Sequence, residues 1–122
     1  MKSLAEVNLD QLIADVRKHA AANPHNVVGC HYFAVEGVPE CIVGCALHDQ
    51  GYTLADLSGR NTTQFEDEVS NNVQRISVLL EREGIFDPKV AWLGCVQRQQ
   101  DESNRWEQAV AIADELYPLT QA

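Results

Sequence analysis

One stretch of the chain constrains the fold more than any other, the apolar run Cys41-Ile-Val-Gly-Cys-Ala-Leu47. Wound as an α-helix, this run presents apolar side chains on nearly every side, which is typical of a helix buried at the centre of a domain. Pro39 at or near the first helical position and Gly51 beyond the end predict a helix over about residues 40–49. Gly44 predicts close approach by another element, because it leaves room for a neighbouring backbone.

Amphipathic helices are predicted on both sides of this segment. Asn8 is a good N-cap, and Leu9, Leu12, Ile13 and Val16 form the apolar stripe of a helix that ends at Asn23-Pro24. Further helices are expected over 54–57 after Thr53, from Thr62 or Thr63 to Gly84, from Asp87-Pro88 onwards, and from Ser103 to Pro118. The prediction is therefore a mainly α, single-domain bundle (1–122) of about five helices around a buried central helix.

The segment before the central helix permits two interpretations. Val27 to Val35 is rich in β-branched and aromatic residues, and Glu36-Gly37 is a turn signal, so a short β-hairpin over about 27–39 is one option. Pro39 weakens the second arm of such a hairpin, which favours the alternative that this arm leads into the helix.

Charge narrows the range of functions. The chain has 18 Asp+Glu against 9 Lys+Arg, a net charge of -9, and 11 of the acids lie in residues 61–122. Phosphate contacts need a surplus of cations, so we expect no nucleic-acid partner. A DNA-binding regulator, the disfavoured alternative, would need one basic face formed by Arg17, Lys18, Arg75, Arg98 and Arg105.

The expected compartment is the cytoplasm, with no membrane association. The N-terminus lacks the apolar run of a signal peptide, and the run 41–47 is too short for the roughly 20 residues that span a bilayer. In a reducing compartment the four cysteines are expected to be free thiols packed as small apolar residues.

Cysteines and histidines nevertheless offer one alternative site. Cys41, Cys45 and His48 share a helix face at i, i+4, i+7 spacing, and Cys30 or His31 could supply a fourth zinc ligand. The same residues allow a hydrolase with Cys41 as nucleophile and His25, His31 or His48 as base. Against the metal site, no Cys-x-x-Cys motif is present and the same face is needed for the core. Against the hydrolase, the sequence places none of these histidines beside Cys41, so no metal or cofactor and no enzymatic activity are predicted.

An interaction surface is the preferred hypothesis. The anionic candidates are Glu66, Asp67 and Glu68 at a helix start with Glu81 and Glu83 near its end, which would steer a basic partner. Trp92 falls beside its helix stripe and is a candidate anchor residue, whereas Trp106 is assigned to the core. The glutamines of the segment Gln97–Gln100 either belong to an exposed helix end or bond loop backbone.

Several short segments carry a resemblance. Cys30-His-Tyr32, Pro39-Glu-Cys41-Ile-Val-Gly44-Cys-Ala-Leu47, Val96-Gln97-Arg-Gln-Gln100-Asp101 and Trp106-x-x-Ala109 are similar to small proteins of actinobacteria and their bacteriophages. The resemblance implies a small cytoplasmic phage-type protein folded around the Cys-Ile-Val-Gly helix, and no particular activity. The expected function is a non-enzymatic module that binds and modulates a host protein, with homodimerisation left open.

Overall fold

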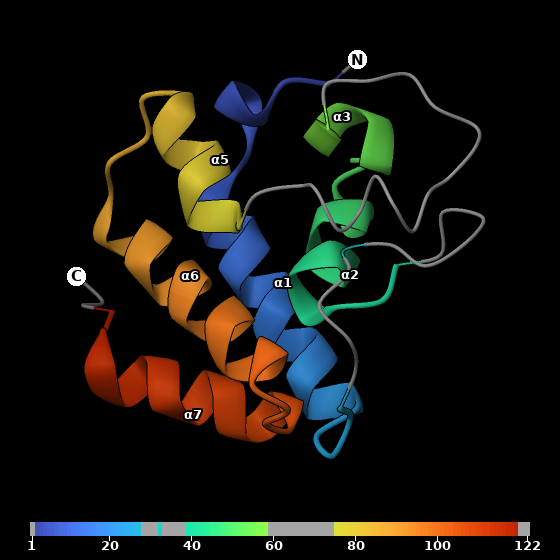
Figure 1. Ribbon diagram of the computed structural model, residues 1–122, viewed down its shortest axis with the longest axis vertical. Coiled ribbons are helices and arrows are strands. Elements are labelled where there is room, and N and C mark those ends of the chain that lie inside the picture. The colour runs from blue at the N-terminus through green and yellow to red at the C-terminus, as the bar shows by residue number, and fades with distance from the viewer. Residues whose placement is uncertain (1, 28–31, 33–38, 59–74, 120–122) are drawn as a thin grey trace.

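The computed structural model describes residues 2–27, 32, 39–58 and 75–119 of the chain (Figure 1). These residues form one short 3-10 helix, Leu4–Glu6, and six α-helices. The helices are α1 (Leu9–Ala22), α2 (Ile42–Asp49), α3 (Leu54–Ser58), α5 (Ile76–Arg82), α6 (Pro88–Asp101) and α7 (Trp106–Leu116). The prediction of a mainly helical bundle is confirmed, while most of the hairpin option over 27–39 lies outside the described residues.

Helix α1 begins where its sequence predicts. The Asn8 side chain accepts a hydrogen bond from the Gln11 amide at 3.0 Å, which satisfies one of the free N–H groups of the first turn. Leu12 and Val16 of the apolar stripe are fully buried. The helix ends at Ala22 before Asn23, as the proline at position 24 requires.

Helix α2 is the buried helix that the apolar run predicts, but it starts later than expected. Its N-cap is Cys41 and its first residue is Ile42, so Pro39 precedes the helix instead of opening it. Gly44 confirms the expected close approach, because a Cβ at this position would overlap the backbone carbonyl of Tyr32. The Tyr32 carbonyl also accepts a hydrogen bond from the Glu40 amide at 3.0 Å.

Helix α6 holds the bundle together, since it contacts α1, α2, α5 and α7. Its buried side chains face several directions and include two glutamines; they are Val90, Trp92, Leu93, Cys95, Val96, Gln97 and Gln100. In Figure 1, α6 lies between α7 and α5 in the view, with α1 beside it. The core is therefore formed by α2 together with α6, although the sequence of α6 contains many polar residues.

The two buried glutamines of α6 cap the starts of two other helices. Gln100 Oε1 accepts a hydrogen bond from the Ile42 amide at 2.9 Å, and Gln97 Oε1 accepts one from the Ile76 amide at 2.8 Å. These amides are the first N–H groups of α2 and α5, which have no partner within their own helices. Of the two alternatives for these glutamines, an exposed helix end and bonding to backbone, Gln97 and Gln100 take the second, although the backbone that they bond belongs to helix starts and not to loops.

One predicted helix is interrupted, and one predicted helix start is wrong. Arg75 is the extended N-cap of α5, so the helix expected from Thr62 or Thr63 to Gly84 is not continuous; residues 59–74 lie outside the described residues. Ser103 does not cap α7, because it has a φ of 71° after α6 and the N-cap is Arg105. Carbonyls of the segment after α1 accept from the first amides of α7: Trp106 N donates to Asn26 O at 3.0 Å and Glu107 N donates to Pro24 O at 3.1 Å.

Among the described residues, no helix has the length and apolar character needed to cross a membrane.

Candidate functional site

Cys41, the candidate nucleophile and metal ligand, serves the fold. Its thiol is buried and its Sγ accepts a hydrogen bond from the Gly44 amide at 3.2 Å, as an N-cap does. Burial raises the pKa of Cys41 to about 12. A thiol with such a pKa stays protonated near neutral pH and is a poor nucleophile and ligand.

The other members of the predicted metal set lie in different environments. Cys45 is half-buried, burial raises its pKa as well, and His48 is exposed. Cys30 and His31 are outside the described residues. Within the described ranges, no group of three or more His, Cys, Asp or Glu side chains could hold a metal ion.

Trp92 is a core residue, which corrects its assignment as a partly exposed anchor. Its side chain is 0% exposed, and its indole Nε1 donates to Asp114 Oδ1 at 2.9 Å. Arg17 lies over the Trp92 ring, 5.0 Å from the centroid, and makes two hydrogen bonds to the Asp114 carboxylate at 2.9 and 2.8 Å. The sequence pattern puts Trp92 beside the main apolar stripe of its helix. In the structure, residues of α1 and α7 cover this position.

The Arg17–Asp114 pair is electrostatically stabilised. The hydrogen bonds from Arg17 lower the pKa of Asp114, and the same contact raises the pKa of Arg17. The carboxylate is thus the partner of a cation on α1 and of an indole on α6.

The cations that a DNA-binding face would need are mostly paired with acids. Arg17 lies 2.8 Å from Asp114, and the other close pairs are Lys18 with Asp49 at 3.7 Å, Arg75 with Asp101 at 3.6 Å and Arg105 with Glu107 at 3.8 Å. Such local neutralisation leaves little net positive field for a phosphate backbone, which weighs against the DNA-binding alternative.

Of the predicted acidic surface, the structure describes only the part at the end of α5. Glu81 and Glu83 are exposed there and make no ion pair with any described residue. Glu66, Asp67 and Glu68 lie outside the described residues.

Close to these two acids in the sequence, the chain exposes Phe86, which was not predicted to take part in an interaction. Its side chain is 79% exposed, more than any other large hydrophobic residue in the described ranges. Its position between Gly84, which ends α5, and Pro88, which opens α6, is the signal that could have identified it. A side chain in a tight connection between two helix ends has few neighbours that can cover it.

The backbone around Phe86 is fixed on both sides. Gly84 has a φ of 79°, and the Ile85 amide donates to Leu80 O at 3.0 Å, which closes the end of α5. On the other side, Asp87 Oδ1 accepts a hydrogen bond from the Lys89 amide at 2.9 Å and caps α6. Phe86 is therefore held between two anchored helix ends.

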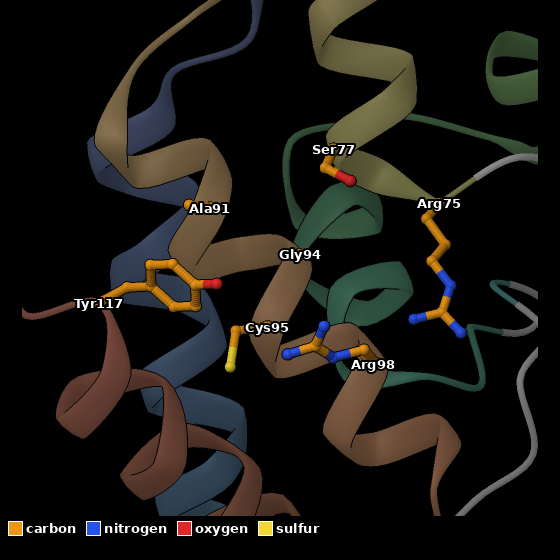
Figure 2. Close-up of a pocket in the computed structure, with 7 residues that line it drawn as sticks. All are labelled: Arg75, Ser77, Ala91, Gly94, Cys95, Arg98 and Tyr117. Carbon is orange, nitrogen blue, oxygen red and sulfur yellow. The ribbon is translucent and has the colours of Figure 1, made fainter.

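A cavity of about 210 Å³ lies between α5, α6 and the end of α7. Figure 2 shows the described residues that line it, among which are two arginines and no carboxylate; they are Arg75, Ser77, Ala91, Gly94, Cys95, Arg98 and Tyr117. The sequence named both arginines only as parts of a hypothetical basic face. No sequence spacing brings these positions together, because the packing of three helices does so.

Comparisons with family models, with curated proteins and with solved structures found no match to this chain.

Proposed function

We propose that this protein is a non-enzymatic interaction module that binds another protein through the turn between α5 and α6. We define the acidic turn as Glu81, Glu83, Phe86 and Asp87. The observation that carries the proposal is the 79% exposure of Phe86 at a turn whose backbone is fixed. The partner surface that fits this turn is an apolar pocket with basic residues around it.

Exposure alone would be a weak argument, because single apolar residues are common on protein surfaces. Phe86 differs because the caps on both sides restrict the backbone that presents it. A preorganised aromatic side chain loses less conformational entropy on binding than a side chain on a flexible loop. Aromatic residues that fill a pocket at the centre of an interface commonly supply much of the binding energy.

The acids beside Phe86 indicate that the surface of the proposed partner is basic. Glu81 and Glu83 lack cationic partners within the described part of the chain, so their field extends into solvent. Such a field raises the rate of association with a basic surface and disfavours acidic partners. Arg82, also exposed, lies between them in sequence and reduces this field only in part.

The alternatives that use cysteine chemistry receive less support. Burial and the raised pKa of Cys41 disfavour a thiolate nucleophile, and its Sγ already caps α2. The resemblance to small actinobacterial and phage proteins supports a cytoplasmic host protein as the partner. An oligomer of this chain through the same turn would bring acids of like charge together, so a heterologous partner is favoured.

Site-specific photo-crosslinking tests the proposal. The photoreactive residue p-benzoylphenylalanine replaces Phe86 in one variant and Val27, another exposed apolar residue, in the control. In an actinobacterial lysate we expect one dominant adduct from position 86 that diminishes at high salt, and none of the same mass from position 27. Identical adducts from both positions, or no adduct from position 86, would overturn the proposal.

A further inference from the structure

The cavity lined by Arg75, Arg98 and Tyr117 differs in charge from the chain around it. The whole chain has twice as many acids as bases, yet the described residues that line the cavity provide two guanidinium groups and no carboxylate. It lies on α5, α6 and the residue after α7, and none of its lining residues belongs to the acidic turn. The two features can therefore be tested separately.

The arginines of this cavity retain unused hydrogen-bond donors. Arg98 is exposed and forms no ion pair within the described ranges. Arg75 is paired only loosely, since its Nη2 lies 3.6 Å from Asp101 Oδ2, whereas Arg17 contacts both oxygens of Asp114 at 2.9 and 2.8 Å. A planar guanidinium with free donors is well suited to carboxylate or phosphate oxygens.

Figure 2 shows how the side chains are arranged around the opening. Arg98 extends over α6 on the side of Cys95 and Tyr117, while Arg75 projects from the start of α5 on the other side. The remaining lining offers the Ser77 hydroxyl and the apolar surfaces of Ala91 and the Tyr117 ring.

The absence of a side chain at Gly94 contributes to this space. A Cβ at Gly94 would lie 3.1 Å from the Ser77 Cβ, so the glycine lets α5 approach α6 at the cavity. The resulting volume of about 210 Å³ is below the roughly 300–1,000 Å³ of pockets for drug-sized ligands. Only a small ligand fits.

We propose that this cavity binds a small organic anion, in which a carboxylate or phosphate contacts Arg98, Arg75 adds positive charge at the opposite rim, and a short apolar group packs on Tyr117. Carboxylate and phosphate share the oxyanion chemistry that guanidinium groups recognise, and both remain ionised near neutral pH. The charge of the ligand distinguishes this site from the acidic turn, which attracts cationic groups.

NMR titration of the ¹⁵N-labelled full chain tests the site with phenyl phosphate, benzoate, inorganic phosphate and the cation benzylamine as probes. We expect saturable shifts of the Ser77, Gly94 and Cys95 amides with phenyl phosphate or benzoate at concentrations up to about 10 mM, ten times a weak Kd of about 1 mM. Tighter binding of phenyl phosphate assigns the site to a phosphate ester, and tighter binding of benzoate assigns it to a carboxylate. Weaker binding of inorganic phosphate than of phenyl phosphate supports the apolar contact.

Matched variants decide whether the arginines hold the anion. Arg98→Gln should weaken binding at least tenfold and Arg75→Gln should weaken it by a smaller factor, whereas Arg82→Gln removes the same charge from the exposed end of α5 and should leave the Kd unchanged. Thermal unfolding shows whether each variant is folded. No saturable shift with either organic anion, equal binding of benzylamine, or an unchanged Kd in both cavity variants would overturn the proposal.

Discussion

The environments of Cys41 and Cys45 disfavour a function that depends on a reactive or metal-binding thiol. Cys41 lies in the buried core and burial raises its pKa to about 12, so its thiol is protonated at pH 7. Cys45 is half-buried and more accessible. The chemistry of each thiol is set by its burial and not by the residue type that the sequence reveals.

Iodoacetamide labelling at neutral pH should therefore modify Cys45 well before Cys41. Mass spectrometry of digested protein after timed labelling measures both rates in one sample. Protein unfolded in urea is the control, in which both cysteines should react at similar rates. Labelling of Cys41 in the folded protein as fast as in urea would contradict the assignment.

Asp114 connects stability to pH. Its pKa is lowered in the folded protein, chiefly by hydrogen bonds from Arg17, so its stabilising contribution is present above the unfolded value of about 3.8. That contribution is lost as the pH falls below 3.8 and through the lower folded pKa. Asp114→Asn should lower the free energy of unfolding at pH 7 by about 1 kcal/mol, because the pair is partly exposed.

Asp114→Ala should cost about 1–3 kcal/mol more than Asp114→Asn, since only the amide can still accept the hydrogen bond from the buried Trp92 indole. Urea unfolding at pH 7 and pH 3 measures all three proteins. The difference between wild type and Asp114→Asn should shrink at pH 3. An equal difference at both pH values would show that the charge of Asp114 has no part in stability.

Gly44 and Gly94 form a matched pair of helical glycines. Alanine at position 44 would overlap the Tyr32 carbonyl, which is backbone and cannot turn aside, whereas at position 94 it would meet the Ser77 side chain at 3.1 Å. Gly44→Ala should destabilise by about 1–3 kcal/mol or more. Gly94→Ala should stay within about 1 kcal/mol, because the helix gains roughly 0.5–1 kcal/mol from alanine. Equal stability of the two variants in urea would contradict this packing.

Among the helices, the starts that the sequence predicted are those with a local cap. Asn8 and Asp87 accept hydrogen bonds from amides two or three residues ahead, so α1 and α6 begin as expected. By contrast, Ile76 is bonded to Gln97, 21 residues away, and Trp106 is bonded to Asn26. Sequence signals near a helix start cannot reveal a cap that comes from a distant element.

Helix α6 illustrates the same limit. Its sequence is polar towards its end, and Gln97 and Gln100 resemble surface residues, yet both are buried and bonded. The apolar run of α2 correctly predicted a buried helix, but the polar glutamines concealed that α6 contacts most of the other helices. Buried polar residues of this kind can be recognised only once the structure shows their hydrogen-bond partners.

Replacing either glutamine with leucine should lower the free energy of unfolding by about 1–3 kcal/mol, because a buried amide loses its acceptor. Hydrogen exchange should show faster exchange at Ile42 in Gln100→Leu and at Ile76 in Gln97→Leu. The control is Gln99→Leu, whose side chain is half-buried and bonds Asn104, with an expected change within about 0.5 kcal/mol. Unchanged exchange at both amides would refute the capping role.

In the molecule as a whole, the acidic composition drew attention to the end of α5 but did not identify Phe86. Glu81 and Glu83 were predicted as interaction residues from charge alone, whereas the aromatic beside them is marked only by its exposure. The anion cavity was not predictable either, because it forms where α5, α6 and Tyr117 meet. The sequence reveals which residues are charged, but the packing of the helices determines which of them lie together on one surface.

In the proposed interface, Phe86 supports binding and not folding. The most direct test is the Kd of the partner captured by crosslinking, measured for wild type and Phe86→Ser together with their thermal unfolding midpoints. We predict an unchanged midpoint and a Kd at least tenfold weaker, a loss of about 1.4 kcal/mol or more. A Kd that Phe86→Ser leaves unchanged would contradict the proposed interface.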